Sequence, residues 1–236
     1  ALVVFGNDVI IMSDKLISFD AQANKSVAWE RWYRKAVAGS IRQLRGAFNQ
    51  LTKFPQRIFC DVHASSPFPL VIPKAENMRV HLIAVANGCA DAHLRSLGYP
   101  GLCIDTHCDN DSPFMSVGVK YPEFVHVFST AALEAIFNCF DTTRDLIDYL
   151  VRKQEALSGD ERFLIRGEEN LVAAYVMSQS GNSDFYIPSD DFPIENGVKT
   201  VPAGLWDLYA KSPLREKRDE IRRSSYVVDD LVDHMA

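Results

Sequence analysis

The chain has 236 residues, of which 47% are hydrophobic and 24% are charged, and its formal net charge is −6. This composition is typical of a globular protein and excludes a disordered chain, and the length fits one large domain or a domain with a substantial annex. The acidic balance does not indicate a nucleic-acid binder, although a local basic patch can bind nucleic acid within an acidic protein.

Membrane and export signals are not visible in the sequence. No apolar run approaches the length of a membrane span, and no basic leader with a cleavage pattern occurs. The five cysteines form an odd number without a compact framework, which predicts thiols in a reducing, cytoplasmic setting. The first residue, Ala1, already lies in a predicted strand, and we therefore expect a truncated or processed N-terminus.

The first predicted element is a tight hairpin. Two short apolar runs rich in Val and Ile, Leu2–Phe5 and Val9–Met12, are separated by the cluster Gly6-Asn7-Asp8. Runs of this kind on either side of a Gly/Asn/Asp cluster predict two paired strands. The second run is apolar at every position, which predicts a strand that is covered on both faces.

Charged and polar residues follow directly after this second strand. Side chains alternate between the two faces of a strand. If the strand continues, Ser13 and Lys15 share a face with Ile11, and Asp14 points to the other face.

A long amphipathic helix follows a polar loop. Ser26 is a plausible N-cap, the helical period begins at Val27, and Pro55 ends the pattern. The apolar side also carries Gln43, close to Gly39 and Gly46, and glycines at these positions predict close approach to another backbone. The outer face is basic and contains Arg31, Arg34, Lys35, Arg42 and Arg45.

The remaining elements alternate between strand and helix patterns. Further strands are predicted over Arg57–Asp61, Arg79–Ala86, Phe114–Val119 and Glu123–Phe128, the last two around a turn. Helices are predicted over Asn87–Gly98, Thr130–Phe140, a segment capped by Asp141 or Thr142 and ending at Leu157, Glu168–Ser178, Leu205–Ala210 and Leu214–Met235. The regions Gly101–Pro113 and Gly181–Lys199 are predicted to be irregular. This order predicts an α/β core over residues 1–87 and a helix-rich annex over 88–236.

The motifs of the chain resemble a known superfamily. The stretches VVFGNDVIIMSDK, WERWYRKAVAGSIRQLRGA, EFVHVFS, FDTTRDLIDYL and RGEENLVAAYV are similar to a group of uncharacterised bacterial proteins thought to be related to nucleases. The front half resembles the PD-(D/E)xK nuclease superfamily. This resemblance implies a restriction-endonuclease-like mixed sheet flanked by helices, with Lys15 as the catalytic lysine and Gln43 as a water-orienting residue.

The resemblance also implies an activity and a cofactor. Such proteins are Mg²⁺- or Mn²⁺-dependent endonucleases acting on DNA, because phosphodiester cleavage needs a divalent ion to neutralise the phosphate and activate a water. Asp14 and Asp8 are the candidate carboxylate ligands for that ion. The acid-x-Lys signature would place its acid at Ser13, and the acid of the preceding strand would lie near or before Ala1.

Two alternatives stay open beside the nuclease interpretation. The serine at position 13 favours a catalytically silent, nuclease-like scaffold or binding subunit of a larger complex, with a partner protein or a second copy of the chain. The stretch from Asp105 to Asp111 offers metal-ligand residue types without a recognised zinc spacing. Asp61 and His63 after a predicted strand are weaker candidates for a site.

Overall fold

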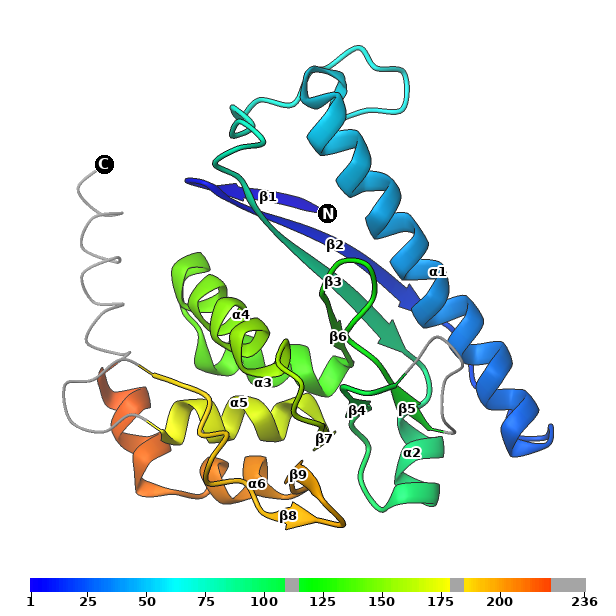
Figure 1. The fold of residues 1–236 in the computed structure, drawn as a ribbon, viewed down its shortest axis with the longest axis vertical. Helices are drawn as coiled ribbons and strands as arrows, with labels where there is room; N and C mark the ends of the chain where they lie inside the picture. Colours follow the sequence, from blue (N-terminus) through cyan, green and yellow to red (C-terminus); the bar gives the residue numbers. More distant parts are fainter. Residues whose placement is uncertain (109–114, 179–184, 222–236) are drawn as a thin grey trace.

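The computed structural model describes residues 1–108, 115–178 and 185–221, and shows a mixed α/β fold with two mixed sheets (Figure 1). The strands are β1 (Leu2–Phe5), β2 (Asp8–Leu16), β3 (Arg79–Asn87), β4 (Cys103–Asp105), β5 (Ser116–Val117), β6 (Val125–Phe128), β7 (Phe163–Arg166), β8 (Ile194–Glu195) and β9 (Val198–Val201). The helices are α1 (Lys25–Lys53), a 3₁₀ turn (Pro55–Arg57), α2 (Ala90–Leu97), α3 (Thr130–Cys139), α4 (Thr143–Leu157), α5 (Glu168–Met177) and α6 (Leu205–Ala210).

The first sheet has the strand order β1-β2-β3-β6. The predicted hairpin is confirmed, since β1 and β2 pair antiparallel from Leu2 opposite Ile11. β2 and β3 then pair in parallel from Asp8 opposite Arg79 to Leu16 opposite Asn87. A parallel neighbour requires a crossover connection, and α1 supplies it on one face of the sheet, while α3 and α4 lie on the other side (Figure 1).

The long helix α1 is capped by Asn24, not by Ser26 as the sequence predicts. The side-chain oxygen of Asn24 accepts a hydrogen bond from the backbone N–H of Ser26 at 3.0 Å. At the other end the helix stops at Lys53, before Pro55. The indole N–H of Trp32 donates to the carbonyl of Asn87 at 3.2 Å and ties the helix to the end of β3.

The chain after β2 runs on beside the end of β3. The backbone N–H of Ile17 donates to the carbonyl of Asn87 at 3.1 Å, and that of Phe19 donates to Gly88 at 3.2 Å. Gly88 has a φ of +100°, and a Cβ built there would lie 2.1 Å from the carbonyl oxygen of Ile17. This crossing point therefore leaves room only for glycine.

The second sheet has the strand order β5-β4-β7-β9-β8 and is formed from the rear part of the chain. Residues beyond position 87 also supply β6, the edge strand of the first sheet. The first sheet thus draws one of its four strands from the segment that follows residue 87.

Several sequence predictions are corrected. Arg57–Asp61 is not a strand: Arg57 ends the 3₁₀ turn, and the stretch makes only an isolated bridge between Phe59 and Pro67. In the segment opposite, Pro67 and Pro69 have no N–H to donate, so pairing is limited to a few hydrogen bonds, such as that from the N–H of Phe68 to Ile58 at 3.0 Å. The segments predicted over Phe114–Val119 and Glu123–Phe128 contain β5 and β6, but these strands belong to different sheets. Phe114 lies outside the described residues.

Short strands occur where the sequence predicts irregular structure. β4 falls in the region Gly101–Pro113, β8 and β9 fall largely in Gly181–Lys199, and β7 was not predicted. Of the predicted helix Leu214–Met235, residues 214–221 are helical and the rest lies outside the described residues. All other predicted helices are present, with ends shifted by up to three residues.

Among the helices that the structure describes, none combines the length and the apolar character that a membrane crossing requires. The cysteines are thiols that form no disulfide; four are buried and Cys60 is exposed.

Candidate functional site

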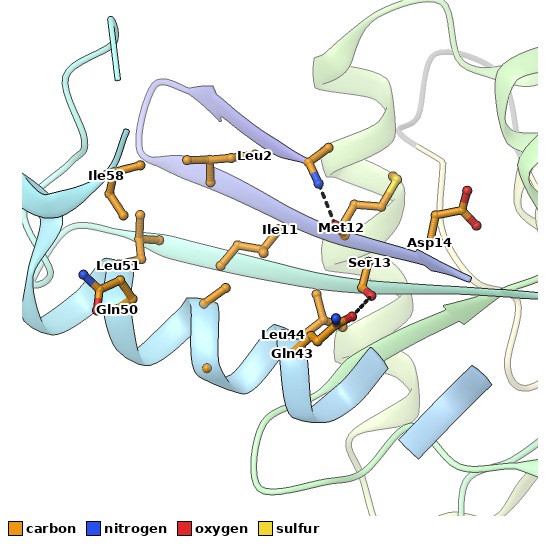
Figure 2. A pocket seen from close by; sticks show the side chains of 13 residues that line it. Leu2, Ile11, Met12, Ser13, Asp14, Gln43, Leu44, Gln50, Leu51 and Ile58 are labelled. Atoms are coloured by element: carbon orange, nitrogen blue, oxygen red, sulfur yellow. Dashed lines mark hydrogen bonds between the residues drawn. The ribbon is translucent and has the colours of Figure 1, made fainter. Parts of the chain in front are cut away.

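The end of β2 brings Ser13 and Lys15 to the face that packs against α1. Ser13 Oγ donates a hydrogen bond to Oε1 of Gln43 at 3.0 Å and is also hydrogen-bonded to Oγ of Ser40 at 3.2 Å (Figure 2). β2 continues to Leu16, so the alternation of side chains places Lys15 on the same face. We call this contact between the end of β2 and α1, defined by Ser13, Lys15, Ser40 and Gln43, the seam.

Gly39 makes room for Lys15 in the seam. A Cβ built at Gly39 would lie 2.9 Å from Nζ of Lys15, so the amine rests directly on the surface of α1. The glycine thus accommodates a side chain, whereas the sequence predicted the approach of another backbone. Gly46, the other glycine of the helix, has no atom within 4 Å of its Cβ position and borders an open pocket.

Asp14 lies on the opposite face of β2. Its Oδ1 accepts a hydrogen bond from Nδ2 of Asn87 at 3.3 Å, and Oδ1 of Asn87 in turn accepts one from Thr130 at 2.8 Å. Figure 2 shows the carboxylate pointing away from Ser13 and Gln43. Asp14 and Gln43 thus border the same pocket, but the carboxylate of Asp14 lies on the face of β2 opposite to that of Ser13 and Lys15.

Asp8 lies at the other end of β2. It lies six positions before Asp14 along the strand, which corresponds to about 20 Å. Asp8 is 7% exposed and is bound by Arg79 at 2.8 Å and by His81 at 3.0 Å. Burial alone would raise the pKa of Asp8, but the hydrogen bonds from Arg79 and His81 hold that pKa below its ordinary value. Asp8 is thus an ion-paired carboxylate that cannot share a metal ion with Asp14.

The seam does not fit the divalent ion that the resemblance implies. Mg²⁺ needs carboxylate oxygens, whereas Ser13, Lys15, Ser40 and Gln43 offer hydroxyls, an amide and an amine. Within the described ranges, no group of three or more His, Cys, Asp or Glu side chains could hold a metal ion. Within the described residues, the seam therefore offers hydroxyl, amide and amine groups but no carboxylate for a metal ion.

A pocket of about 600 Å³ opens beside the seam between β2 and α1 (Figure 2). Ser13 and Gln43 lie at its polar end. Its other described lining residues are largely apolar, among them Ile11, Met12, Leu44, Leu51 and Ile58. The seam is thus open to molecules in solvent rather than sealed in the core.

The exposed face of α1 is strongly basic. The helix contains seven Lys and Arg residues and one acidic residue, Glu30. Arg31, Lys35 and Arg42 lie on one stripe of this face, and all three are exposed. Within the described part of the chain, Arg45 is the one basic residue of the helix with an ion-pair partner, Glu123 at 3.0 Å. This positive helix stands in a chain with a net charge of −6.

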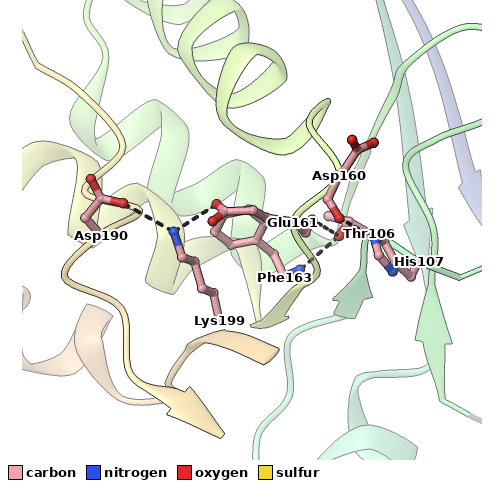
Figure 3. A network of polar contacts seen from close by, with 7 residues as sticks. All are labelled: Thr106, His107, Asp160, Glu161, Phe163, Asp190 and Lys199. Atoms are coloured by element: carbon pink, nitrogen blue, oxygen red, sulfur yellow. Dashed lines mark hydrogen bonds and ion pairs between the residues drawn. The ribbon is translucent and has the colours of Figure 1, made fainter. Parts of the chain in front are cut away.

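The alternative metal region around Asp105 is held by structural contacts. Both carboxylate oxygens of Asp105 accept hydrogen bonds from Arg162, at 3.1 and 2.6 Å. Nε2 of His107 donates to the carbonyl of Asp160 at 3.1 Å, and Lys199 pairs with Glu161 nearby at 2.8 Å (Figure 3). Asp105 and His107 are thus held by contacts with Arg162 and Asp160; Asp109 and Asp111 lie outside the described residues.

The candidate at Asp61 has a structural role. Its carboxylate accepts hydrogen bonds from the backbone N–H groups of His63, Ser65 and Ser66, and these bonds lower the pKa of Asp61. Asp61 therefore closes a turn.

Sequence reasoning missed a buried charged cluster between α4 and α5. Nζ of Lys153 lies 2.7 Å from Oε1 of Glu168, and the hydroxyl of Tyr149 donates to the same oxygen at 2.5 Å. Lys153 and Glu168 are 0% and 1% exposed. His126 is also fully buried, and burial and the nearby charge of Lys153 hold its pKa well below the ordinary value, so the ring is neutral. The sequence feature that could have indicated this cluster is the pair Glu168 and Glu169 at the start of the otherwise apolar stretch RGEENLVAAYV.

Comparison of the chain with protein-family models, with curated proteins and with solved structures gives no match. Any proposal for the function of this α/β chain therefore rests on its own residues and geometry.

Proposed function

We propose that this chain is a DNA-binding domain of the PD-(D/E)xK nuclease type, in which the basic face of α1 contacts the phosphate backbone. The observation that carries the proposal is the row of exposed arginines and lysines on α1 next to the seam. From Arg31 to Arg42 the helix rises about 17 Å, a length of duplex that carries about ten phosphate charges. Lys15 and Gln43 would meet a phosphate at one edge of this surface.

The salt dependence of binding tests the proposal. We expect the triple variant Arg31→Ala, Lys35→Ala, Arg42→Ala to bind a fluorescent duplex more weakly in anisotropy titrations at several salt concentrations. The slope of log K against log salt should become shallower by about one for each phosphate contact removed.

A matched control makes the same charge change elsewhere. Lys74, Arg95 and Lys211 are exposed and belong to three other parts of the chain. Their triple alanine variant should keep the affinity and the salt slope of the wild type. Equal losses in both triple variants would show that only net charge matters, and would reject α1 as the DNA-binding surface.

Hydrolysis of DNA is the second candidate function, favoured by the placement of Lys15 and Gln43 in one seam. Lys15 would stabilise charge that develops on a phosphate, and Gln43 would orient the attacking water. The metal-ligating carboxylate that such chemistry needs is not present in the seam among the described residues. We therefore place DNA binding without cleavage first.

Plasmid nicking with Mn²⁺ separates the two candidates. DNA binding alone predicts that the purified chain does not nick supercoiled plasmid. If the chain does nick, Lys15→Ala should abolish the reaction while anisotropy still detects binding. Equal nicking by the wild type and Lys15→Ala would remove Lys15 from the site.

A further inference from the structure

A second pocket lies far from the seam in the sequence and has a different chemistry. Its volume is about 680 Å³, within the range of small-molecule sites. The loop after α2, helix α3, the first turn of α5 and helix α6 enclose it. The charged residues that line it are all acidic, namely Glu134, Glu169 and Asp207, and none of the described lining residues is basic.

The carboxylate of Glu169 is built into the wall of this pocket. The residue is only 7% exposed. A Cβ built at Gly101 would lie 2.3 Å from Oε1 of Glu169, and one built at Gly167 would lie 2.2 Å from the same atom. Gly167 also has a φ of +94°, which favours glycine. Two glycines thus create the space that this carboxylate occupies.

No positive charge among the described residues compensates for this carboxylate. Oε2 of Glu169 is buried and has no hydrogen-bond partner within the described part of the chain. Burial, then the charges of Glu168 and Asp207, raise the pKa of Glu169 to about 7. A buried carboxylate without a partner is costly, and a cation in the adjoining pocket would lower that cost.

The rest of the lining indicates the chemistry of that cation. Tyr99 and Trp206 border the same pocket, and aromatic rings attract organic cations. A bare metal ion is disfavoured, because no described group of three ligating side chains could hold one. We propose that the pocket formed by Tyr99, Glu169, Trp206 and Asp207 binds a small organic cation with an amine, amidine or guanidinium head. This inference does not rest on the proposed DNA binding.

A charged probe and its neutral isostere test the proposal. We expect benzamidine to bind the full chain at pH 8 in isothermal titration calorimetry, and benzamide, which has the same shape without the charge, to bind at least tenfold more weakly. Glu169→Gln should weaken benzamidine binding at least tenfold, and Asp207→Asn should weaken it severalfold. Glu76→Gln removes an exposed carboxylate outside the pocket and should leave the affinity unchanged.

The pH dependence provides an independent measurement. The titratable and charged groups around Glu169 are Glu168 on its own helix, Glu134 on α3, Asp207 on α6 and Tyr99 on the loop after α2, with Cys103 and Arg166 next to Tyr99. With a pKa of about 7, the ionised fraction of Glu169 rises about tenfold between pH 6 and pH 8. Benzamidine affinity should rise by the same factor, and the rise should be absent in Glu169→Gln.

Folding of the variants is checked separately by urea unfolding at pH 8. Glu169→Gln replaces a buried charge by a neutral amide, so its midpoint should not fall below that of the wild type. Equal binding of benzamide and benzamidine, or unchanged benzamidine binding in both Glu169→Gln and Asp207→Asn, would overturn the proposal. Absence of benzamidine binding to the folded wild type at millimolar concentration would also overturn it.

Discussion

Replacement of Lys153 by methionine is expected to lower the free energy of unfolding by about 3–5 kcal/mol, because it leaves a buried carboxylate without its counter-charge. The ammonium of Lys153 lies 2.7 Å from Glu168, and both side chains are excluded from solvent. Urea denaturation at pH 7 measures the effect. In the double variant Lys153→Met, Glu168→Gln, part of the loss should be recovered, since the remaining charge is also removed.

The preceding residue on the same helix is a matched control for Lys153. Arg152 is exposed and lies 3.5 Å from Glu155, so Arg152→Met should cost less than about 1 kcal/mol. If the two single variants were equally stable, the buried pair between Lys153 and Glu168 would not be a main stabilising contact between α4 and α5.

Gly88→Ala is expected to lower the free energy of unfolding by about 3 kcal/mol or more, since two costs add at this position. Alanine is strained at a φ of +100°, and its Cβ would collide with the carbonyl of Ile17 at 2.1 Å. Relief of that collision would separate the segment after β2 from the end of β3. Thermal and urea unfolding both measure the loss.

Gly6→Ala distinguishes the two costs at Gly88. Gly6 has a φ of +59° in the hairpin turn, but no atom lies within 4 Å of its Cβ position. This variant should therefore show only the backbone strain of about 1–2 kcal/mol. Equal destabilisation by the two glycine variants would contradict the close contact at Ile17.

Local sequence patterns were sufficient to predict the framework of the first sheet. The Gly/Asn/Asp cluster defines the hairpin, the helical period defines α1, and the β-rich run Arg79–Ala86 matches β3. The alternation of side chains along β2 also predicted that Ser13 and Lys15 share a face that Asp14 does not. These features depend on neighbours in the sequence, so they can be read without knowledge of the packing.

Apart from β5, which lies within a predicted strand, the second sheet could not be predicted in this way, because its strands are two to four residues long and lie on distant parts of the chain. β7 contains the β-favouring residues Phe163 and Ile165, but it is only four residues long and is defined by its pairing with β4 and β9. Arg57–Asp61 shows the opposite case. The segment has the composition of a strand, but no neighbouring strand among the described residues pairs with it. The pair of Lys153 and Glu168 escaped prediction because burial of charged side chains depends on tertiary packing.

The parallel pairing of β2 with β3 has a consequence for how this chain folds. The paired residues Asp8 and Arg79 are 71 positions apart, so closure of the intervening chain costs about 4 kcal/mol of entropy before any strand contact forms. Helix α1 lies inside that loop and can form on the microsecond timescale by local contacts. We therefore expect the search for the β2–β3 register to be the slow step of folding, and α1 to shorten that search by replacing a flexible connection with a rigid one.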